Sequence, residues 1–185
     1  MRRQAHLLVL LCCSIAAIAQ APDNGNQNSL VLKDFNRRVA GYVKLHKTAL
    51  AEIHRLKPTN STEAIEHYEH HLAHGIREAR SDVVRGSVFA PAIADEFRRL
   101  IGITMQGPDA ARIRESLNAA PVHIHAIRVN SAYPAGLPLQ SMPASLLLNL
   151  PPLPPEVEYR VVGHDLVLRD VDANLIVDFI TNAIP

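Results

Sequence analysis

The stretch VEYRVVGHDLVLRDVDANLIVDFI, residues 157–180, contains the clearest strand pattern of the chain. Two strand-like runs, VEYRVV and LVLRD, flank Gly163 and His164, a pair suited to a tight hairpin turn. A second turn, from Asp170 to Ala173, leads into the run NLIVDFI. This pattern predicts three short antiparallel strands connected as a β-meander.

A sheet of this size is marginally stable alone, so the meander must bury one face against the rest of the chain. Side chains alternate along a strand, and the apolar residues on one side therefore identify that face. The residues expected there are Tyr159, Val161, Leu166, Leu168, Ile176 and Phe179.

Upstream of the meander, apolar residues recur at steps of three and four, the spacing of one face of an α-helix. The first stripe comprises Leu32, Phe35, Val39, Tyr42, His46, Ala49, Ile53 and Leu56, and the second comprises Ile65, Tyr68, Leu72, Ile76, Ala79 and Val83. Two long amphipathic helices are therefore predicted.

A short loop joins these helices and predicts a helical hairpin. Pro58 ends the first helix, and Asn60 with Glu63 has the form of a capping box for the second. Gly41 and Gly75 each lie 17 residues from Pro58, so they are level in an antiparallel hairpin. The two glycines either let the helices approach closely or are unrelated residues that weaken each helix by about 1 kcal/mol relative to alanine.

Two shorter helices open with proline, in PAIADEFRRLIG at 91–102 and PDAARIRESLNAA at 108–120. The predicted fold class is therefore α+β: an N-terminal helical hairpin plus two shorter helices, then a small three-stranded antiparallel β-meander. We expect a helical domain at 30–119, an extended proline-rich connector at 120–155, and the meander packed on the helices at 156–185.

The connector contains three local patterns. PVHIHAIRVN at 121–130 alternates like a strand, and PASLLLNL at 143–150 allows at most two helical turns. PPLPP at 151–155 predicts a stiff polyproline II segment. That segment is interpreted as a spacer, or alternatively as a ligand for an aromatic groove of some partner.

The N-terminus has the pattern of a secretory signal peptide at 1–19. Arg2 and Arg3 precede the apolar stretch LLVLLCCSIAAIA, and Ala19 offers a small residue for cleavage. This stretch of 13 residues is shorter than the roughly 20 that a bilayer-spanning helix needs. We therefore expect an exported protein, periplasmic or extracellular, with a flexible N-terminus at 20–29 and no transmembrane segment after cleavage.

Signal cleavage removes the two cysteines of the chain, Cys12 and Cys13. The mature chain then has no disulfide, no thiolate metal ligand and no thiol nucleophile. A lipid anchor on either cysteine is the alternative, but Leu10 and Leu11 precede them where a lipoprotein signal has a small residue.

Charge and motifs exclude several function classes. A formal net charge of +1 without a basic stripe argues against nucleic-acid binding. The sequence contains no GxSxG elbow, SxxK, phosphate-binding glycine loop, dinucleotide fingerprint or HExxH. We therefore predict no catalytic residue, no bound cofactor and no enzymatic activity.

The segment HYEHHLAH, residues 67–74, places His67, His70, His71 and His74 on one helix. At 100° per residue they point away from the apolar stripe, so the imidazoles are expected to face solvent. The pairs His67–His71 and His70–His74 have the i, i+4 spacing at which two imidazoles can share a metal ion. A pair supplies only two ligands, so the row is interpreted either as a solvated face or as a weak site for zinc, nickel, cobalt or copper.

The remaining polar positions have structural interpretations. His46 interrupts an apolar stripe and is expected to be a core residue hydrogen-bonded to backbone. His123 and His125 lie on one side of the predicted strand, a spacing that metal sites use but that in-out alternation also explains. Asp170 and Asp172 lie at a turn, where aspartate is favoured for local hydrogen bonds.

The segments FAPAIADEFRRLI at 89–101 and LPPLPPEVEYRVVGHDLVLRDVDANLIVDFI at 150–180 resemble a family of exported bacterial proteins that carry no assigned activity. Residues 159–180 are also similar to the short β-domain of a periplasmic nickel and cobalt homeostasis family, although that family has a glycine where this chain has Ala173 and Asn174. The first family carries over no catalytic residue, and we expect non-enzymatic binding or scaffolding in the cell envelope, for which an unknown protein partner is possible. The alternative is a periplasmic divalent-metal binder that uses the surface histidines.

Overall fold

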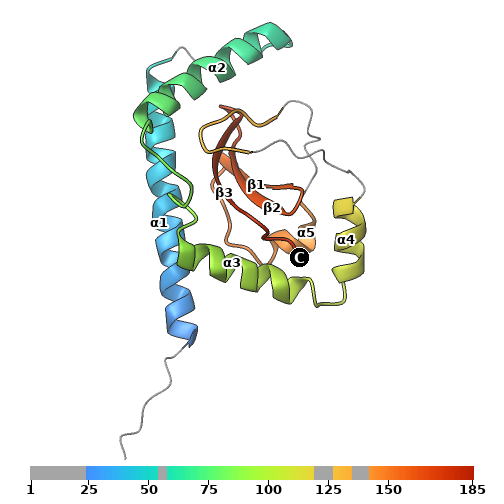
Figure 1. The fold of residues 1–185 in the computed structure, drawn as a ribbon. Helices are drawn as coiled ribbons and strands as arrows, with labels where there is room; N and C mark the ends of the chain where they lie inside the picture. The colour runs from blue at the N-terminus through green and yellow to red at the C-terminus, as the bar shows by residue number, and fades with distance from the viewer. Residues whose placement is uncertain (1–23, 54–57, 119–126, 135–141) are drawn as a thin grey trace, which may run out of the picture.

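The computed structural model describes residues 24–53, 58–118, 127–134 and 142–185. In these ranges five helices precede a three-stranded antiparallel sheet, so the predicted α+β class is confirmed (Figure 1). The predicted signal peptide lies outside the described residues. Among the helices of the described ranges, none has the length and apolar character that crossing a membrane requires.

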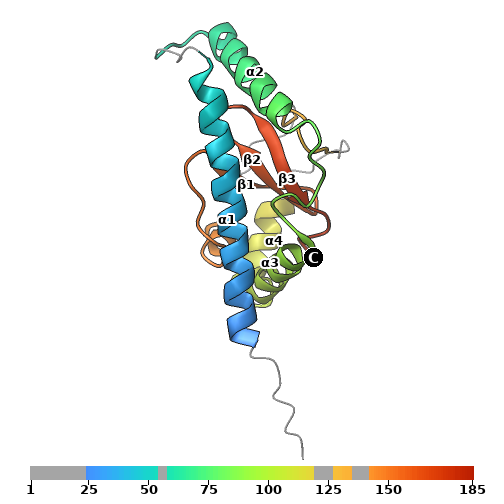
Figure 2. The ribbon, with the colours of Figure 1, turned by 90° about the vertical axis from the view of Figure 1, so that its left-hand side faces the viewer.

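The long helix α1 stands on one side of the molecule, α2 packs near its C-terminal end, and α3 runs from α1 along one end of the sheet (Figures 1 and 2). The helices are α1 (Asn24–Ala51), α2 (Thr62–Ala79), α3 (Pro91–Thr104), α4 (Ala110–Asn118) and α5 (Ala144–Leu147), and the strands are β1 (Val157–Val162), β2 (Asp165–Asp170) and β3 (Leu175–Ile180).

Helix α1 begins at Asn24, six residues before the predicted start of the helical domain. The expectation of a flexible segment at 20–29 is therefore wrong for 24–29. Once a helix has formed, adding a residue to its end costs little free energy. The helix that the packed stripe downstream stabilises therefore extends through these polar residues.

The middle of the predicted stripe, from Phe35 to Ala49, is buried, and an aromatic cluster anchors it. Leu32 and Ile53 are half-buried, Leu56 lies outside the described residues, and α1 ends at Ala51 rather than just before Pro58. Phe35 lies 4.9 Å from Phe97 of α3 and 5.8 Å from Phe89, measured between ring centroids. Phe97 in turn lies 5.9 Å from Tyr159 of β1. Since these rings come from α1, α3, the loop before it and the sheet, they join the helical part and the meander in one core.

Helix α2 is capped by Ser61, whose Oγ accepts a hydrogen bond from the Ala64 N–H at 3.2 Å. The predicted cap, Asn60, is one residue too early. Ser61 has the extended backbone that an N-cap requires, with φ −76° and ψ 112°, so its side chain rather than that of Asn60 reaches the first turn.

The two helices meet near one end of α1. A Cβ added at Gly75 would lie 3.6 Å from Cβ of Ala49, whereas Gly41 has open space around it. The expectation that Gly41 and Gly75 lie level is therefore wrong. Because α2 crosses α1 close to Ala49, the N-terminal half of α2 extends beyond the contact (Figure 1).

The shorter elements follow the sequence closely. Pro91 occupies the first turn of α3 as predicted, but α4 begins at Ala110, two residues after Pro108. Helix α5 is a single short element at 144–147. The proline-rich segment after it is tied to the sheet, since the Tyr159 hydroxyl donates to the Pro151 carbonyl at 3.0 Å.

The strands pair in the order β1-β2-β3, with a tight turn at Gly163, whose φ is +61°. Four predicted residues of the helix-facing side lie in the main core: Tyr159, Val161, Leu166 and Leu168.

The prediction is wrong for Ile176 and Phe179 of β3, which lie on the opposite face. Leu175 and Val177 take the helix-facing positions instead. The pairing of β2 with β3 has a register shift after Leu168, and a shift of one residue moves every following side chain to the other face.

The second face of the sheet is covered by part of the connector. Residues 130–133 run along the outer edge of β3, where the Ile176 N–H donates to the Ser131 carbonyl and the Tyr133 N–H to the Asn174 carbonyl. Tyr133 packs on Ile176 and Phe179. The connector therefore protects an edge strand rather than only spanning a distance.

Asp178, fully buried on the helix-facing side of β3, fixes the loop between α2 and α3. Its carboxylate accepts hydrogen bonds from the backbone N–H groups of Gly86, Val88 and Phe89 at 2.8–3.2 Å. Gly86 has φ +92°, a conformation that glycine adopts without strain.

We expect Asp178→Asn to lower the free energy of unfolding by about 3 kcal/mol or more, because each hydrogen bond to a charged group contributes about 1.5 to 3 kcal/mol. The amide would also present N–H groups to backbone donors. Urea denaturation followed by circular dichroism measures the change. The exposed Asp82→Asn is the control, expected within about 0.5 kcal/mol of the wild type. Equal loss in both variants would contradict this account of Asp178.

Candidate functional site

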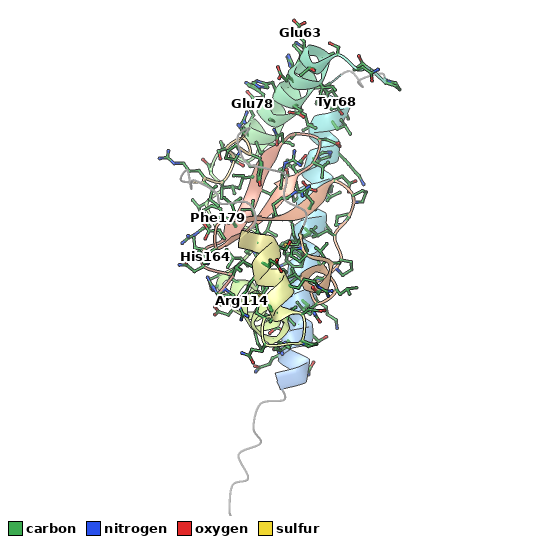
Figure 3. The ribbon with its side chains drawn as sticks, turned by 90° about the vertical axis from the view of Figure 1, so that its right-hand side faces the viewer. Glu63, Tyr68, Glu78, Arg114, His164 and Phe179 are labelled. Carbon is green, nitrogen blue, oxygen red and sulfur yellow. The ribbon has the colours of Figure 1, made fainter. Side chains whose placement is uncertain are left out.

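The four predicted site histidines, His67, His70, His71 and His74, are all exposed on α2. The predicted outward direction of the row is therefore confirmed. The buried side of α2 is formed by Leu72, Ala73 and Ile76, all in its C-terminal half. Figure 3 shows Glu63 at the free tip of this helix and Glu78 near its other end.

His67 and His71 form a close pair. Their Nε2 atoms lie 3.1 Å apart and their ring centroids 4.3 Å apart, with 44° between the ring planes. The i, i+4 spacing puts both residues on one face of the helix, which lets the rings converge. His74 is directed elsewhere, since its Nδ1 lies 3.5 Å from Oε2 of Glu78.

Two imidazole nitrogens at this separation can share either a proton or a metal ion. Divalent zinc binds imidazole nitrogen at about 2.0–2.1 Å. An ion bound to both Nε2 atoms would therefore make an Nε2–metal–Nε2 angle of roughly 95°. This angle is near the 90° of octahedral coordination, and a small opening of two exposed side chains reaches the tetrahedral value. The pair is a ready bidentate ligand.

The pair supplies two ligands and no more. Across the described ranges, no group of three or more His, Cys, Asp and Glu side chains is placed to hold a metal ion. Glu63 and Glu66, the nearest acidic residues before His67 on α2, therefore do not complete a site. His123 and His125 lie outside the described residues.

A buried polar cluster around His46, which the sequence did not reveal, lies in the core. Tyr42 and His46 share one face of α1, and both contact Oδ2 of the buried Asp170 at the end of β2. The Tyr42 hydroxyl donates at 2.7 Å and Nδ1 of His46 lies at 2.6 Å. The other oxygen of Asp170 accepts from the Ala173 N–H at 2.8 Å.

The burial of His46 is as predicted, but its partner is a carboxylate rather than backbone. Asp170 does make the expected local turn bond to Ala173, and it also makes the two bonds to α1. No local pattern could have indicated this, because His46 and Asp170 are 124 residues apart. The spacing of Tyr42 and His46 on one stripe was the only available signal.

The electrostatics favour a protonated His46. Burial lowers the pKa of His46, but the hydrogen bond to Asp170 and the charges of Asp170, Asp172 and Glu156 outweigh it and raise the pKa above its ordinary value. Burial raises the pKa of Tyr42 as well, which keeps its hydroxyl protonated as a donor.

This cluster has the form of an Asp–His pair but not the access that a general base needs. Nε2 of His46 is buried and has no hydrogen-bond partner among the described residues. The acidic oxygen nearest to this Nε2 atom is Oδ2 of Asp172, at 3.6 Å. A catalytic base must reach the proton it abstracts from a substrate. The geometry instead ties α1 to the sheet.

Comparisons with known proteins do not add a functional assignment. The chain matches no protein-family model, no curated protein and no solved structure. The two resemblances inferred from the sequence therefore stay predictions.

We expect His46→Asn to lower the free energy of unfolding by about 3 kcal/mol at pH 6, because it leaves the buried charge of Asp170 without its cationic partner. A pKa raised in the folded state stabilises the protein below the unfolded-state pKa, and this stabilisation is lost as pH rises through the folded-state pKa. The cost of the substitution should therefore be smaller at pH 9. Urea denaturation at both pH values measures it.

The exposed His74→Asn serves as the matched control and should change stability little at either pH. A cost of His46→Asn that grew between pH 6 and pH 9 would contradict the assignment of a protonated His46.

Proposed function

We propose that this protein is a non-enzymatic binding protein whose ligand is a divalent transition-metal ion, held by His67 and His71. The observation that carries this proposal is the 3.1 Å separation of the two Nε2 atoms on an exposed helix face. Imidazole nitrogen suits zinc, copper and nickel, whereas calcium and magnesium prefer oxygen ligands.

The placement of the polar groups supports binding over catalysis. The imidazoles of α2 can be reached from solvent, while the Asp170–His46 pair is buried in the core and contributes to packing. The predicted signal peptide, if it is used, would bring the protein into the periplasm or the extracellular space, where it would meet metal ions outside the cytoplasm.

Scaffolding through a protein partner is the second candidate function. Leu147 and Leu148 favour it, since they are 43% and 85% exposed at the end of α5. Leu148 borders a hollow that Ile113 and Pro143 also line. Apolar side chains exposed side by side are a feature of protein interaction surfaces.

We expect isothermal titration of the untagged protein with Ni²⁺ or Zn²⁺ at pH 7.5 to give saturable heat in the micromolar range. The double variant His67→Ala/His71→Ala should weaken binding roughly tenfold or more, because it removes both protein ligands.

The matched control is His70→Ala/His74→Ala, which removes the same number of imidazoles from the same helix and should keep the heat of binding. Absence of saturable heat in the wild type, or equal weakening in the two double variants, would reject this metal site. Absence of heat with both ions would favour the scaffolding alternative.

A further inference from the structure

We infer that a second copy of this chain completes the metal site, so that one zinc ion is held by His67 and His71 of two molecules. The inference rests on the proposed metal-binding function and names the partner that function requires. The observation behind it is that His67 and His71 supply only two of the ligands that zinc needs and lie on a projecting part of α2.

The coordination of zinc sets the requirement. Protein-bound zinc takes four ligands in structural sites and at least three protein ligands in catalytic ones. The described part of the chain offers the two imidazoles of this pair and no third acidic, cysteine or histidine group in place. A second copy brings an identical pair, and together they give four nitrogens.

The position of the pair leaves room for that second copy. No residue of α2 before Leu72 is buried, and Ile65, although part of the apolar stripe, remains 38% exposed. The N-terminal half of α2 projects past the contact with α1, as both ribbon views show (Figures 1 and 2). An approaching molecule can therefore reach His67 and His71 without displacing the core.

Charge makes the association depend on the metal. Helix α2 carries four glutamates, Glu63, Glu66, Glu69 and Glu78, against one arginine, Arg77, which is a net charge of −3 with neutral histidines. Two such helices repel each other at close range. A divalent cation at the crossing point offsets this repulsion, so the dimer should form only when the ion is bound.

Geometry also sets the expected arrangement. The two histidines of each pair lie one turn apart on their helix, so the line that joins their Nε2 atoms runs roughly along the helix axis. Opposite edges of a tetrahedron are perpendicular. If two pairs share one tetrahedral ion, the two α2 helices therefore cross each other at a steep angle. A twofold axis passes through the ion, and the same residues lie on both sides of the interface.

The test measures mass and stoichiometry together on the untagged full chain. With Zn²⁺, light scattering after size exclusion should show the mass doubling, and calorimetry should give one ion per two chains. A chelator should return the monomer. His67→Ala/His71→Ala should stay monomeric with zinc, while His70→Ala/His74→Ala should dimerise like the wild type.

Replacing Zn²⁺ by Co²⁺ gives a second readout. Intense d–d absorption bands that appear together with the dimer indicate a four-coordinate nitrogen site, and their loss in His67→Ala/His71→Ala assigns the ligands. Weak bands of a hydrated octahedral ion would overturn the four-histidine site.

The failures of the two proposals are distinguishable. One ion per chain at unchanged mass overturns the shared site but leaves metal binding by His67 and His71 standing. A dimer that persists with chelator also overturns it, because the contact would not be built on the ion. No saturable heat with Zn²⁺ overturns the shared zinc site, and no saturable heat with either Zn²⁺ or Ni²⁺ removes both proposals.

Discussion

A single buried carboxylate, Asp170 at the end of β2, holds the long helix α1 in register with the sheet. Its two oxygens accept hydrogen bonds from Tyr42, His46 and the Ala173 N–H. Apolar contacts such as those of Phe35 tolerate some sliding, whereas a buried charge without its partners costs several kcal/mol. Only an alignment of α1 that brings both donors to Asp170 avoids that cost, so the helix and the meander are fixed together.

A second buried carboxylate decides the direction of α2. Asp178 holds the loop that follows α2. Arg80, the C-cap residue of α2, donates a hydrogen bond to the Val177 carbonyl at 3.0 Å. The C-terminal end of α2 is thus attached to β3, while its contact with α1 lies near Gly75. The N-terminal half of α2 is left beyond both contacts, and this is the part that carries His67 and His71.

The chain therefore uses the same residue type in two opposite ways. His46 is enclosed and paired with a carboxylate that raises its pKa, so it contributes to stability and is closed to ligands. His67 and His71 are exposed and converge on each other, which is the geometry that the proposed metal site requires. Burial separates these roles, since solvent access decides whether an imidazole can exchange its partner. A structural role and a binding role can thus coexist without competing.

The sequence by itself determined the helices, the three strands, the outward direction of the histidine row and the core position of His46, because these follow from local periodicity and turn chemistry. It misplaced Ile176 and Phe179, because a register shift in the strand pairing is invisible in a single strand's pattern. Only the tertiary structure decided that α2 crosses α1 near Ala49 and that Asp170 pairs with His46 across 124 residues. Those outcomes depend on which distant groups must satisfy a buried charge, and no local spacing encodes that requirement.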